Sequence, residues 1–504
     1  MTKKILAISF EPWQTEMCAS INTSIQKQLS LKNCGVFVTD TFQVTNIGAK
    51  KKLDVLKGEF KQDFWDISQE YYQWQKKDNS KNVDYSALVY EWQKNNKINE
   101  STKLIEYSDH VLNHYEREPY YKKLTESQKA QIVYDLIVKT EKVIEELQPT
   151  FVWCLEKSYS VKFIAYIICK NKGIPFLTLI GSRIENLCYI HPCFGMGGEE
   201  LTLGKDRIEK KASIDKAELY IKNTIQNKKS ELYASGTSKR KENIAKGTLG
   251  MPEGFLVNIL SRLKNRDSRE IKGNNIYNGS WFLRFCYMIF KQLRILRFRF
   301  FGDYHHTEAR LDKKKYFLYP LHARPESSIL VLGNGYDDEL AIQNILTFLP
   351  LGVCLVLKEN PSMVELRKAS FYKKFKNNKN LIFAPTLSDS RALIEKSLGV
   401  ISISGTMLLE AAILGKPAYA IGNPEFVECL DGHGIGGLKR FLIKASNQAI
   451  IPRRQAVKNY LSYIFSSSQE IPWKRRIMLA NVESRNKYSD LIAKMFVNYY
   501  ETKL

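Results

Sequence analysis

The sequence has 504 residues, of which 76 are Lys or Arg and 53 are Asp or Glu, giving a formal net charge of +23. At roughly 100 to 200 residues per domain, this length predicts two or three lobes and excludes a single small core. Hydrophobic residues make up 44% and charged residues 26%, which excludes an intrinsically disordered chain. The positive charge favours an anionic partner, which can be nucleic acid, anionic lipid, or a phosphorylated or acidic glycan.

The first residues do not have the pattern of a secretory signal. The apolar run Ile5 to Phe10 is short and is closed by Glu11 and Pro12. No stretch reaches the roughly 18 uncharged apolar residues that a membrane span needs. The nine cysteines include no CxxC pair, which indicates reduced thiols. These features predict a cytoplasmic protein.

The N-terminal region predicts a parallel sheet that a helical insertion interrupts. Between residues 50 and 145 the chain is rich in Lys, Glu, Gln and Tyr and poor in Pro and Gly, which predicts a mainly helical insertion. Strand and helix patterns alternate on either side of this insertion. The expected elements are strands at Ile5–Ser9, Gly35–Val38, Phe151–Leu155 and Phe176–Ile180, and helices at Met17–Leu29 and Ser160–Lys170. We therefore expect a first Rossmann-like lobe over residues 1–200.

Residues 201–315 predict a basic helical connector or insertion. The part from about 199 to 280 is polar and poor in strand signals, as in an insertion or a mobile segment between lobes. Residues 281–301 carry apolar side chains at spacings of three and four along one helix face, with Arg and Lys on the rest. Such an amphipathic helix either lies in a membrane interface or packs on a core. The adjoining Lys313 to Lys315 favours contact with anionic membrane lipids.

The C-terminal region predicts a second, more regular lobe over residues 316–470. The expected strands are Ser328–Leu332, Val353–Leu357, Leu381–Phe383, Gly399–Ser404 and Pro417–Ile421, after a strand-like Tyr316–Tyr319. The expected helices are Asp338–Leu349, Met363–Phe375, Arg391–Ser397 and Thr406–Leu414. Alternating strands and helices of these lengths specify a doubly wound, mostly parallel sheet. Residues 471–504 are expected to be helical and to pack back on the first lobe.

The segment Val400–Pro417 has the most specific chemical pattern in the sequence. Its strand ends in Ser404-Gly405-Thr406 and opens a helix, so backbone N–H groups and two hydroxyls are expected to bind an anion at the positive helix end. Glu410 follows Thr406 by one helical turn, where a carboxylate can accept hydrogen bonds from both hydroxyls of a ribose. The alternative is an ordinary strand-to-helix turn in which Thr406 is a cap.

This segment resembles the donor-binding motif of GT-B glycosyltransferases, especially bacterial capsule and surface-polysaccharide enzymes related to transferases of 3-deoxy-manno-octulosonic acid (Kdo). Tyr319–Glu326 is similar to the family's "PLHxxPE" element, and Leu357–Pro361 resembles its "KEHP" element. Lys172–Pro175 and Ser182–Ile184 also resemble the family. The likeness covers residues from about 316 to 425 well, and 1–40 and 146–195 more thinly. It implies an α/β, GT-B-like fold of two Rossmann-like lobes with a cleft between them and helical insertions.

The resemblance implies donor-binding roles for several residues of the C-terminal lobe. His322 is implied as a ligand of the donor phosphate or sugar, and Glu326 as the residue that holds its loop. Lys358 and Glu359 follow a buried strand, where Lys358 can neutralise a phosphate. The alternatives are a structural histidine and a solvated charged loop. Asn360 replaces the histidine of "KEHP" and donates only neutral hydrogen bonds, so the identity of the donor stays open.

The N-terminal lobe is expected to bind the acceptor. A carboxylate at the lobe edge can serve as the general base, and Glu11 and Glu156 are the candidates because each ends a predicted strand. Either can instead be a turn residue. Arg183 is a candidate for binding an acidic acceptor or a donor carboxylate, or for a structural salt bridge.

The predicted activity is transfer of a sugar from a nucleotide-sugar, CMP-Kdo-like or UDP-linked, to a growing glycan or lipid-linked acceptor of a bacterial surface polysaccharide. Neither a metal nor another cofactor is expected, because helix termini and basic side chains can stabilise the leaving nucleotide and no Asp-x-Asp motif occurs. Peripheral contact with anionic inner-membrane lipids is expected, and nucleic-acid binding is not. The alternatives are a nucleotide-sugar epimerase of the same architecture and a non-catalytic protein that binds membranes or polyanions. The glycine-rich Gly432–Gly437 is either a phosphate cradle or a mobile loop.

Overall fold

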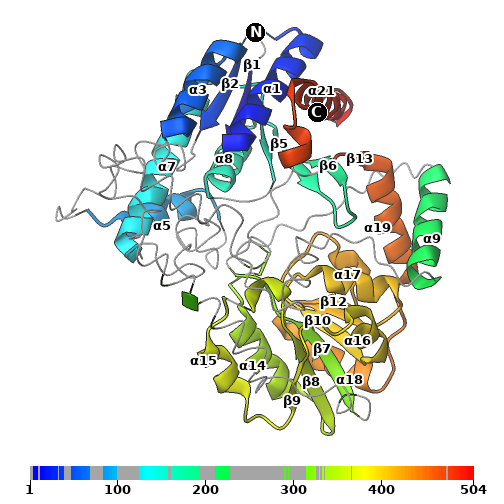
Figure 1. Ribbon diagram of the computed structural model, residues 1–504. Helices are drawn as coiled ribbons and strands as arrows, with labels where there is room; N and C mark the ends of the chain where they lie inside the picture. The colour runs from blue at the N-terminus through cyan, green and yellow to red at the C-terminus, as the bar shows by residue number, and fades with distance from the viewer. Residues whose placement is uncertain are drawn as a thin grey trace.

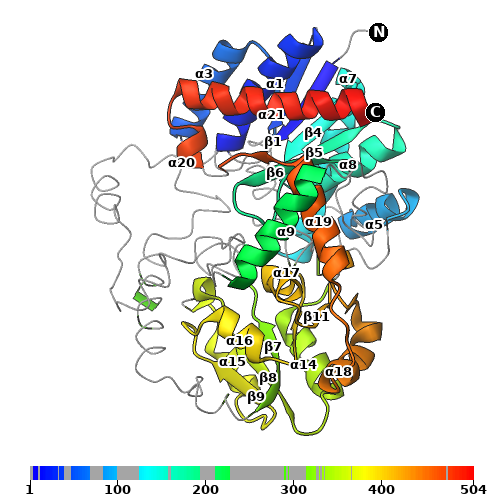
Figure 2. The same ribbon diagram turned by 90° about the vertical axis from the view of Figure 1, so that its right-hand side faces the viewer.

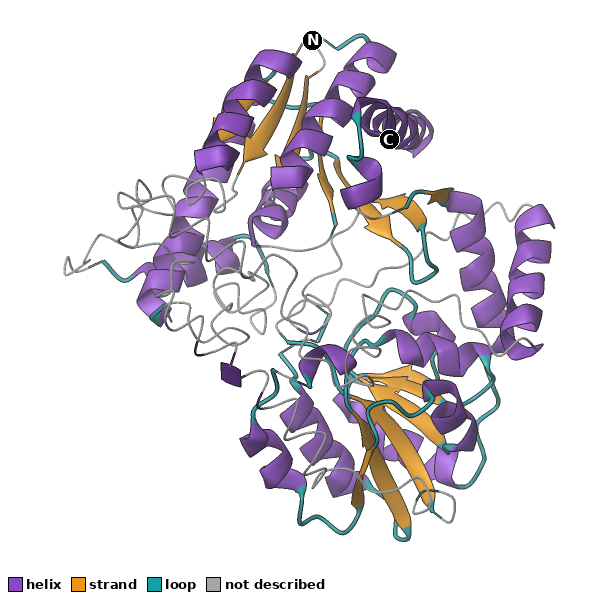
Figure 3. Cartoon of the chain, viewed as in Figure 1, coloured by secondary structure: helices purple, strands orange, loops and turns teal. Residues whose placement is uncertain are grey.

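The computed structural model forms two α/β lobes, each built on one sheet (Figure 1). It describes residues 4–9, 12–31, 33–38, 47–67, 83–98, 124–156, 160–192, 211–226, 286, 289–290, 293, 311, 314–324, 329, 332–333, 335–364, 366–472 and 475–503. Both chain ends lie on the N-terminal lobe, and the two sheets are well separated in the cartoon (Figure 3).

The sheet of the N-terminal lobe has the strand order β3-β2-β1-β4-β5-β6-β13. Its strands are β1 (Lys4–Ser9), β2 (Asn33–Val38), β3 (Asp63–Asp66), β4 (Phe151–Leu155), β5 (Phe176–Gly181), β6 (Leu187–His191) and β13 (Gln469–Glu470). Five neighbouring strands, β3, β2, β1, β4 and β5, pair in parallel. Strand β6 is antiparallel to both of its neighbours, β5 and β13. The four strands expected in this region are confirmed. The order 3-2-1-4-5 of the parallel strands is that of a doubly wound sheet, with its switch point between β1 and β4.

Helices cover both faces of this sheet because its strands are apolar on both faces. On one face, Leu6 and Val152 pack against α7 (Glu126–Leu147) and α8 (Ser160–Asn171). On the other, Trp153 packs against α1 (Pro12–Leu29) and α21 (Val482–Lys503), with its ring 4.8 Å from that of Phe496. In Figure 2 α21 crosses in front of the sheet beside α1. The C-terminal residues therefore complete the core of the first lobe.

The described residues of the insertion between 50 and 145 are mainly helical, as predicted, but a strand follows its first helix. Its described helices are α3 (Ile47–Phe60), α5 (Tyr85–Asn95) and α7. The expectation of helix is wrong at Asp63–Asp66, which forms the edge strand β3 beside β2. Trp65 lies over Gly35 of β2, where a Cβ atom would come within 2.2 Å of the indole ring. This cross-strand packing stabilises a strand too short and too polar to be recognised from its sequence.

The sheet of the C-terminal lobe has the strand order β12-β11-β10-β7-β8-β9. Its strands are β7 (Lys315–Pro320), β8 (Val353–Lys358), β9 (Leu381–Ala384), β10 (Gly399–Ser402), β11 (Ala418–Ala420) and β12 (Gly432–His433). All of these strands pair in parallel. Counted along the chain, the order is 3-2-1-4-5-6, which is the doubly wound order with a switch point between β7 and β10. The predicted α/β fold of two Rossmann-like lobes, the GT-B-like arrangement, is confirmed.

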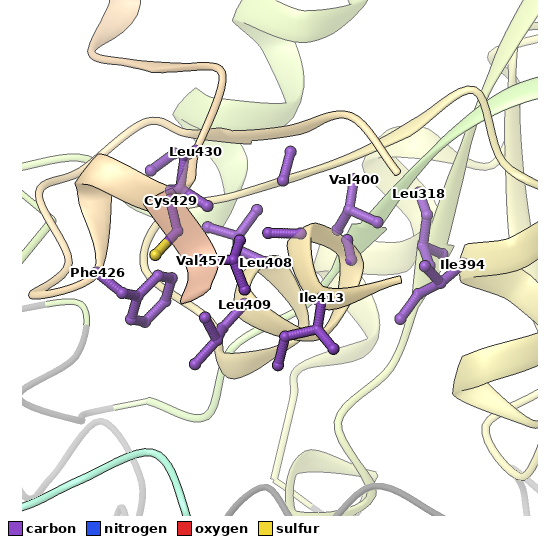
Figure 4. Close-up of a cluster of buried hydrophobic side chains, with 14 of the residues drawn as sticks. Leu318, Ile394, Val400, Leu408, Leu409, Ile413, Phe426, Cys429, Leu430 and Val457 are labelled. Atoms are coloured by element: carbon purple, nitrogen blue, oxygen red, sulfur yellow. The ribbon is translucent and has the colours of Figure 1, made fainter. Parts of the chain in front are cut away.

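Helices α14 (Asp338–Phe348), α15 (Ala369–Phe375), α16 (Ser390–Lys396), α17 (Thr406–Ile413), α18 (Leu438–Ser446) and α19 (Arg454–Ser467) surround this sheet. Figure 4 shows that α17 directs Leu408, Leu409 and Ile413 into an apolar cluster, which also contains Phe426 and Val457. This packing fixes the helix that carries the Ser404–Glu410 motif.

Two predictions in the C-terminal lobe are wrong. The strand expected over 328–332 is not found at its two described residues: Ile329 is helical and Leu332 lies in a turn, because β8 and β10 already occupy both sides of β7. The helix expected over 363–375 is broken into a 3-10 turn, Pro361–Met363, and α15. The break turns Arg367 inward, where its guanidinium binds buried carboxylates.

The two lobes share an apolar core at one side. Ile180, Ile184 and Tyr189 of the N-terminal lobe belong to the same buried cluster as Phe426 and Tyr460. Helix α9 (Lys211–Gln226), which lies within the predicted connector, packs beside α19 (Figure 2). The chain then leaves α19 through β13 and returns to the first lobe through α20 (Arg475–Met478) and α21.

The predicted amphipathic helix 281–301 lies almost wholly outside the described residues. Cys286, Ile289, Phe290 and Leu293 are described and are helical. In the part of the chain that the structure describes, no helix combines the length and apolar character needed to span a bilayer.

Candidate functional site

The carboxyl ends of β7 and β10 bring together two motifs that are about 80 residues apart in the sequence. His322 follows β7 by two residues, and Ser404 follows β10 by two residues. The two strands are neighbours at the switch point of the sheet. In open α/β sheets, the loops at such a point diverge and leave a crevice where ligands bind. The sheet order therefore accounts for the proximity of these motifs.

The His322 imidazole joins the two loops. Its Nδ1 lies 3.0 Å from Oδ1 of Asp338, and its Nε2 lies 3.1 Å from Oγ of Ser402 and 3.5 Å from the Ser404 backbone nitrogen. Burial raises the pKa of the Asp338 carboxyl, but the hydrogen bond from His322 and the charge of Arg367 outweigh burial and lower the pKa to about 2. An ionised Asp338 requires a proton on Nδ1 of His322. Nε2 is thereby directed at the loop after β10.

Asp338, His322 and Ser402 form a hydrogen-bonded chain like that of a nucleophilic triad, but its last member is inaccessible. Ser402 is fully buried, and its Oγ also accepts a hydrogen bond from the Gly405 N–H at 3.2 Å. A triad serine must reach a substrate. The Ser402 hydroxyl instead holds the loop that leads into α17.

Gly405 is the N-cap of α17 and has no side chain with which to cap it. A Cβ atom at this position would lie 2.8 Å from Ser402 Oγ and 3.5 Å from His322 Nε2, so close packing requires glycine. Thr406 is the first residue of the helix, and the alternative in which Thr406 is the cap is therefore wrong. The positive end of α17 therefore receives no side-chain cap from Gly405, and N–H groups at such a helix start can bind an anion.

Glu410 lies one turn into α17 and is half-buried. Its separation of four residues from Thr406 puts the two side chains on the same face of the helix. The predicted spacing of a helix start followed by a carboxylate one turn later is therefore present along α17. The nucleotide contacts predicted for both residues stay predictions.

Lys358 and Glu359 are buried, so the alternative of a solvated charged loop is wrong. Lys358 ends β8, and its ammonium donates a hydrogen bond to the Thr386 carbonyl at 3.1 Å. Glu359 accepts hydrogen bonds from Nε of Arg367 at 2.7 Å, from the Asn360 N–H at 2.7 Å and from the Tyr372 hydroxyl. These contacts give Glu359 an internal structural role, whereas its predicted role in donor binding stays a prediction.

Arg367 connects Glu359 to the histidine. Its Nη1 donates to Asp338 Oδ2 at 3.2 Å, and its Nη2 donates to the backbone carbonyl of His322 at 2.6 Å. Tyr319 adds a hydroxyl at 3.0 Å from Asp338 Oδ1. We call Tyr319, Asp338, Glu359, Arg367 and His322 the histidine support network.

The histidine support network predicts an acid-dependent loss of stability. The pKa of Asp338 is about 2 in the folded protein against an ordinary value of 3.8, so its ionised form contributes about 2 kcal/mol above pH 4. This contribution is expected to disappear as the pH falls from about 4 to about 2. The free energy of unfolding, measured with denaturant at pH 6 and at pH 2.5, should fall more between these two pH values in the wild type than in an Asp338→Asn variant. Equal losses in the two proteins would contradict the ionised assignment.

Glu156, one of the two predicted bases of the N-terminal lobe, lies at the switch point of that lobe, directly after β4. Glu11 is outside the described residues, as is Glu326 of the other lobe. Glu156 follows β4, is half-buried, and has a φ of 65°, an uncommon value for a residue with a side chain. Its N–H donates to the Leu179 carbonyl at 3.0 Å, and the buried Lys162 ammonium binds the carbonyl of Leu155. Such backbone strain at a strand end is typical of functional positions.

Arg183 lies at the contact between the lobes. Its Nε and Nη2 donate to the two carboxylate oxygens of Glu425, at 2.5 and 3.1 Å, and its Nη1 lies 3.4 Å from Oγ1 of Thr406. The predicted alternative of a structural salt bridge is therefore present. The same side chain also reaches the first residue of α17.

Two glycines of the segment Gly432–Gly437 have a packing explanation. The Tyr419 hydroxyl donates to the carbonyls of His433 and Gly434. A Cβ atom at Gly432 or Gly437 would come within 2.7 or 2.5 Å of Tyr419. Tyr419 thus holds this loop, and its role as a phosphate cradle stays a prediction.

Sequence reasoning missed Ser402, Asp338, Arg367 and Glu425. Each is a common residue type in a helix, strand end or loop, and no local pattern distinguishes it. Within the described ranges, no group of three or more His, Cys, Asp or Glu side chains could hold a metal ion.

No protein-family profile and no curated protein matches the sequence. Solved structures that match include UDP-GlcNAc 2-epimerase from Neisseria meningitidis bound to UDP-GlcNAc, at 13% identity and a TM-score of 0.25, over 98% of this chain and 100% of that one. They also include the beta Kdo 2,4 transferase KpsC from Thermosulfurimonas dismutans, at 12% identity and a TM-score of 0.32, over 62% of this chain and 87% of that one. UDP-GlcNAc 2-epimerase from Methanocaldococcus jannaschii matches at 13% identity and a TM-score of 0.27, over 99% of this chain and all of that one. Likenesses at these TM-scores carry no conclusion about the ligand or reaction of this chain.

Proposed function

We propose that this protein is a glycosyltransferase that binds a nucleotide-sugar in its C-terminal lobe. The meeting of His322 and the Ser404–Thr406 loop at the switch point of the sheet carries this proposal. One motif supplies an imidazole of defined orientation, and the other opens a helix at its positive end. The helix start suits the phosphate groups of a nucleotide, and the imidazole holds the loop that leads into it.

The donor lobe binds the nucleotide and stabilises its phosphate as the sugar leaves. The start of α17 supplies hydrogen bonds to the phosphate oxygens, and Glu410 accepts hydrogen bonds from the ribose hydroxyls. His322 holds the loop before α17 in place, because its Nε2 accepts the Ser404 N–H. Fixed donors of this kind need no reorganisation when charge develops on the leaving group. In this proposal, donor binding requires neither a metal nor another cofactor.

The acceptor binds on the N-terminal lobe. Glu156 is the proposed base that takes the proton of the acceptor hydroxyl, supported by its place at the carboxyl end of β4 and its constrained backbone. The acceptor class that we propose is a growing bacterial surface polysaccharide. The net charge of +23 supports an acidic or lipid-linked glycan, with the protein in the cytoplasm and at the inner-membrane surface.

A nucleotide titration tests the donor site directly. Thermal unfolding of the full chain with CMP, UDP and GDP is expected to show stabilisation by one of the three that grows with concentration. The gain should approach about 2.7 kcal/mol when the nucleotide is at 100 times its Kd. The matching nucleoside, which lacks phosphate, is the control and should stabilise far less. The absence of a shift with all three nucleotides would exclude the donor site.

Product analysis then separates the candidate reactions. Transfer requires an acceptor, so the matching nucleotide-sugar should stay intact alone and be consumed when a polysaccharide fragment is added. If the nucleotide-sugar is converted to an epimer in the absence of acceptor, the protein is an epimerase and the proposed transfer reaction is wrong. Binding without either reaction would leave a non-catalytic nucleotide-binding protein.

A further inference from the structure

Arg183 belongs to the N-terminal lobe by sequence but binds the C-terminal lobe through its side chain. It lies between β5 and β6, whereas its partners Glu425 and Thr406 follow β11 and β10. The guanidinium also lies 5.5 Å from the ring centre of Phe426. Arg183 is therefore a cation that one lobe contributes to the ligand-binding end of the other.

Glu425 determines which edge of the guanidinium remains available. The carboxylate binds Nε and Nη2 in a two-point contact, which fixes the plane of the guanidinium. Nη1 is left directed at Thr406, 3.4 Å from its hydroxyl. The Arg183 side chain keeps 19% of its surface exposed, whereas Glu425 keeps 7%. The Nη1 edge therefore faces the start of α17, and the other edge is paired with a buried carboxylate.

The pair is stable in this orientation. Burial lowers the pKa of Arg183, but the charge of Glu425 and its hydrogen bonds outweigh burial, and the pKa is raised above its usual range. The guanidinium thus stays charged at every working pH. Tyr189 and Tyr460, whose side chains act electrostatically on Arg183, are also buried.

We propose that Arg183 is a ligand of the donor, and that its Nη1 binds an anionic oxygen held at the start of α17. The oxygen belongs either to the phosphate of the nucleotide or to the carboxylate of an acidic sugar. Glu425 is the positioning residue that orients Arg183. This inference rests on the proposed function and deepens it, because a bound donor then contacts both lobes.

The test compares ligands that differ in their anionic groups, by titration calorimetry on the full chain. Arg183→Lys keeps a positive charge but loses the planar fork. We expect it to weaken binding of the nucleotide roughly 10- to 100-fold, as for loss of a charge-assisted hydrogen bond, and to leave binding of the nucleoside unchanged. If Arg183→Lys weakens binding only of a nucleotide joined to an acidic sugar, the proposal is supported and the sugar carboxylate is the group that Arg183 binds. Unchanged affinity for both charged ligands would overturn it.

A matched control and a double variant distinguish this role from a structural one. Arg485 is also buried and paired with carboxylates, Glu16 and Glu59, in the N-terminal lobe. Arg485→Lys is expected to leave nucleotide affinity unchanged. Glu425→Ala should weaken nucleotide binding several-fold. The double variant with Arg183→Lys should bind the nucleotide no more weakly than Arg183→Lys alone, because Glu425 acts through Arg183. Additive losses would overturn the assignment of Glu425.

If the wild type binds no nucleotide, the proposed function fails and the inference with it. If the wild type binds nucleotide and Arg183→Lys binds it equally well, only the inference fails. The melting temperature of each variant verifies that it is folded.

Discussion

Replacing Arg367 with methionine is expected to lower the free energy of unfolding by about 3 to 5 kcal/mol. Arg367 is 8% exposed and bridges Asp338 and Glu359, both nearly inaccessible. Methionine fills a similar volume but leaves two buried carboxylates without their cation. Urea unfolding monitored by tryptophan fluorescence or circular dichroism measures the change.

The control for this prediction lies close by in the same lobe. Arg324 pairs with Asp337 at 3.4 Å, and both side chains are about a third exposed. Since exposed pairs contribute little, Arg324→Met should cost less than about 1 kcal/mol. A similar small loss for Arg367→Met would mean that the histidine support network does not stabilise the lobe.

The Arg367 substitution should also affect nucleotide binding. Arg367 donates to the carbonyl of His322 and fixes the carboxylate that orients its imidazole. Conditions that leave Arg367→Met folded should therefore still show weaker nucleotide binding than the wild type. Retained affinity would indicate that the orientation of His322 does not affect the donor site.

Replacing Glu410 with glutamine is expected to weaken nucleotide binding roughly 10- to 100-fold. The proposed contact is a pair of charge-assisted hydrogen bonds from the ribose hydroxyls, and their loss costs about 1.5 to 3 kcal/mol. Glutamine keeps the size of the side chain and removes its charge. Calorimetric titration with the nucleotide selected by the thermal screen measures the affinity.

The 2′-deoxy form of the same nucleotide provides the second half of this experiment. The wild type should discriminate against it, whereas Glu410→Gln should bind the two forms nearly equally. Glu339, an exposed residue of α14 paired with Lys374, provides the matched control, and Glu339→Gln should bind as the wild type does. Full discrimination in the Glu410 variant would show that the ribose contact is made elsewhere.

Much of the architecture follows from the sequence alone. Short apolar runs such as Phe151–Leu155 and Val353–Leu357 are long enough only for buried strands, and each is followed by a helical pattern. This alternation determines parallel sheets covered on both faces. The Ser404–Glu410 segment is likewise local, because its strand end, glycine turn and helix start are consecutive.

Only the tertiary structure decided which distant residues share a site. His322 meets Ser402 because β7 pairs with β10, and Arg183 meets Thr406 because the lobes pack through a common apolar core. Neither contact can be predicted from a periodic pattern in the sequence, because each joins single residues of two distant segments. The strand β3 and the turn at Leu332 have the same explanation: cross-strand packing and the strand order overrode weak local preferences. The sequence determined the two sheets and the α17 motif, and long-range packing determined the cations and carboxylates around them.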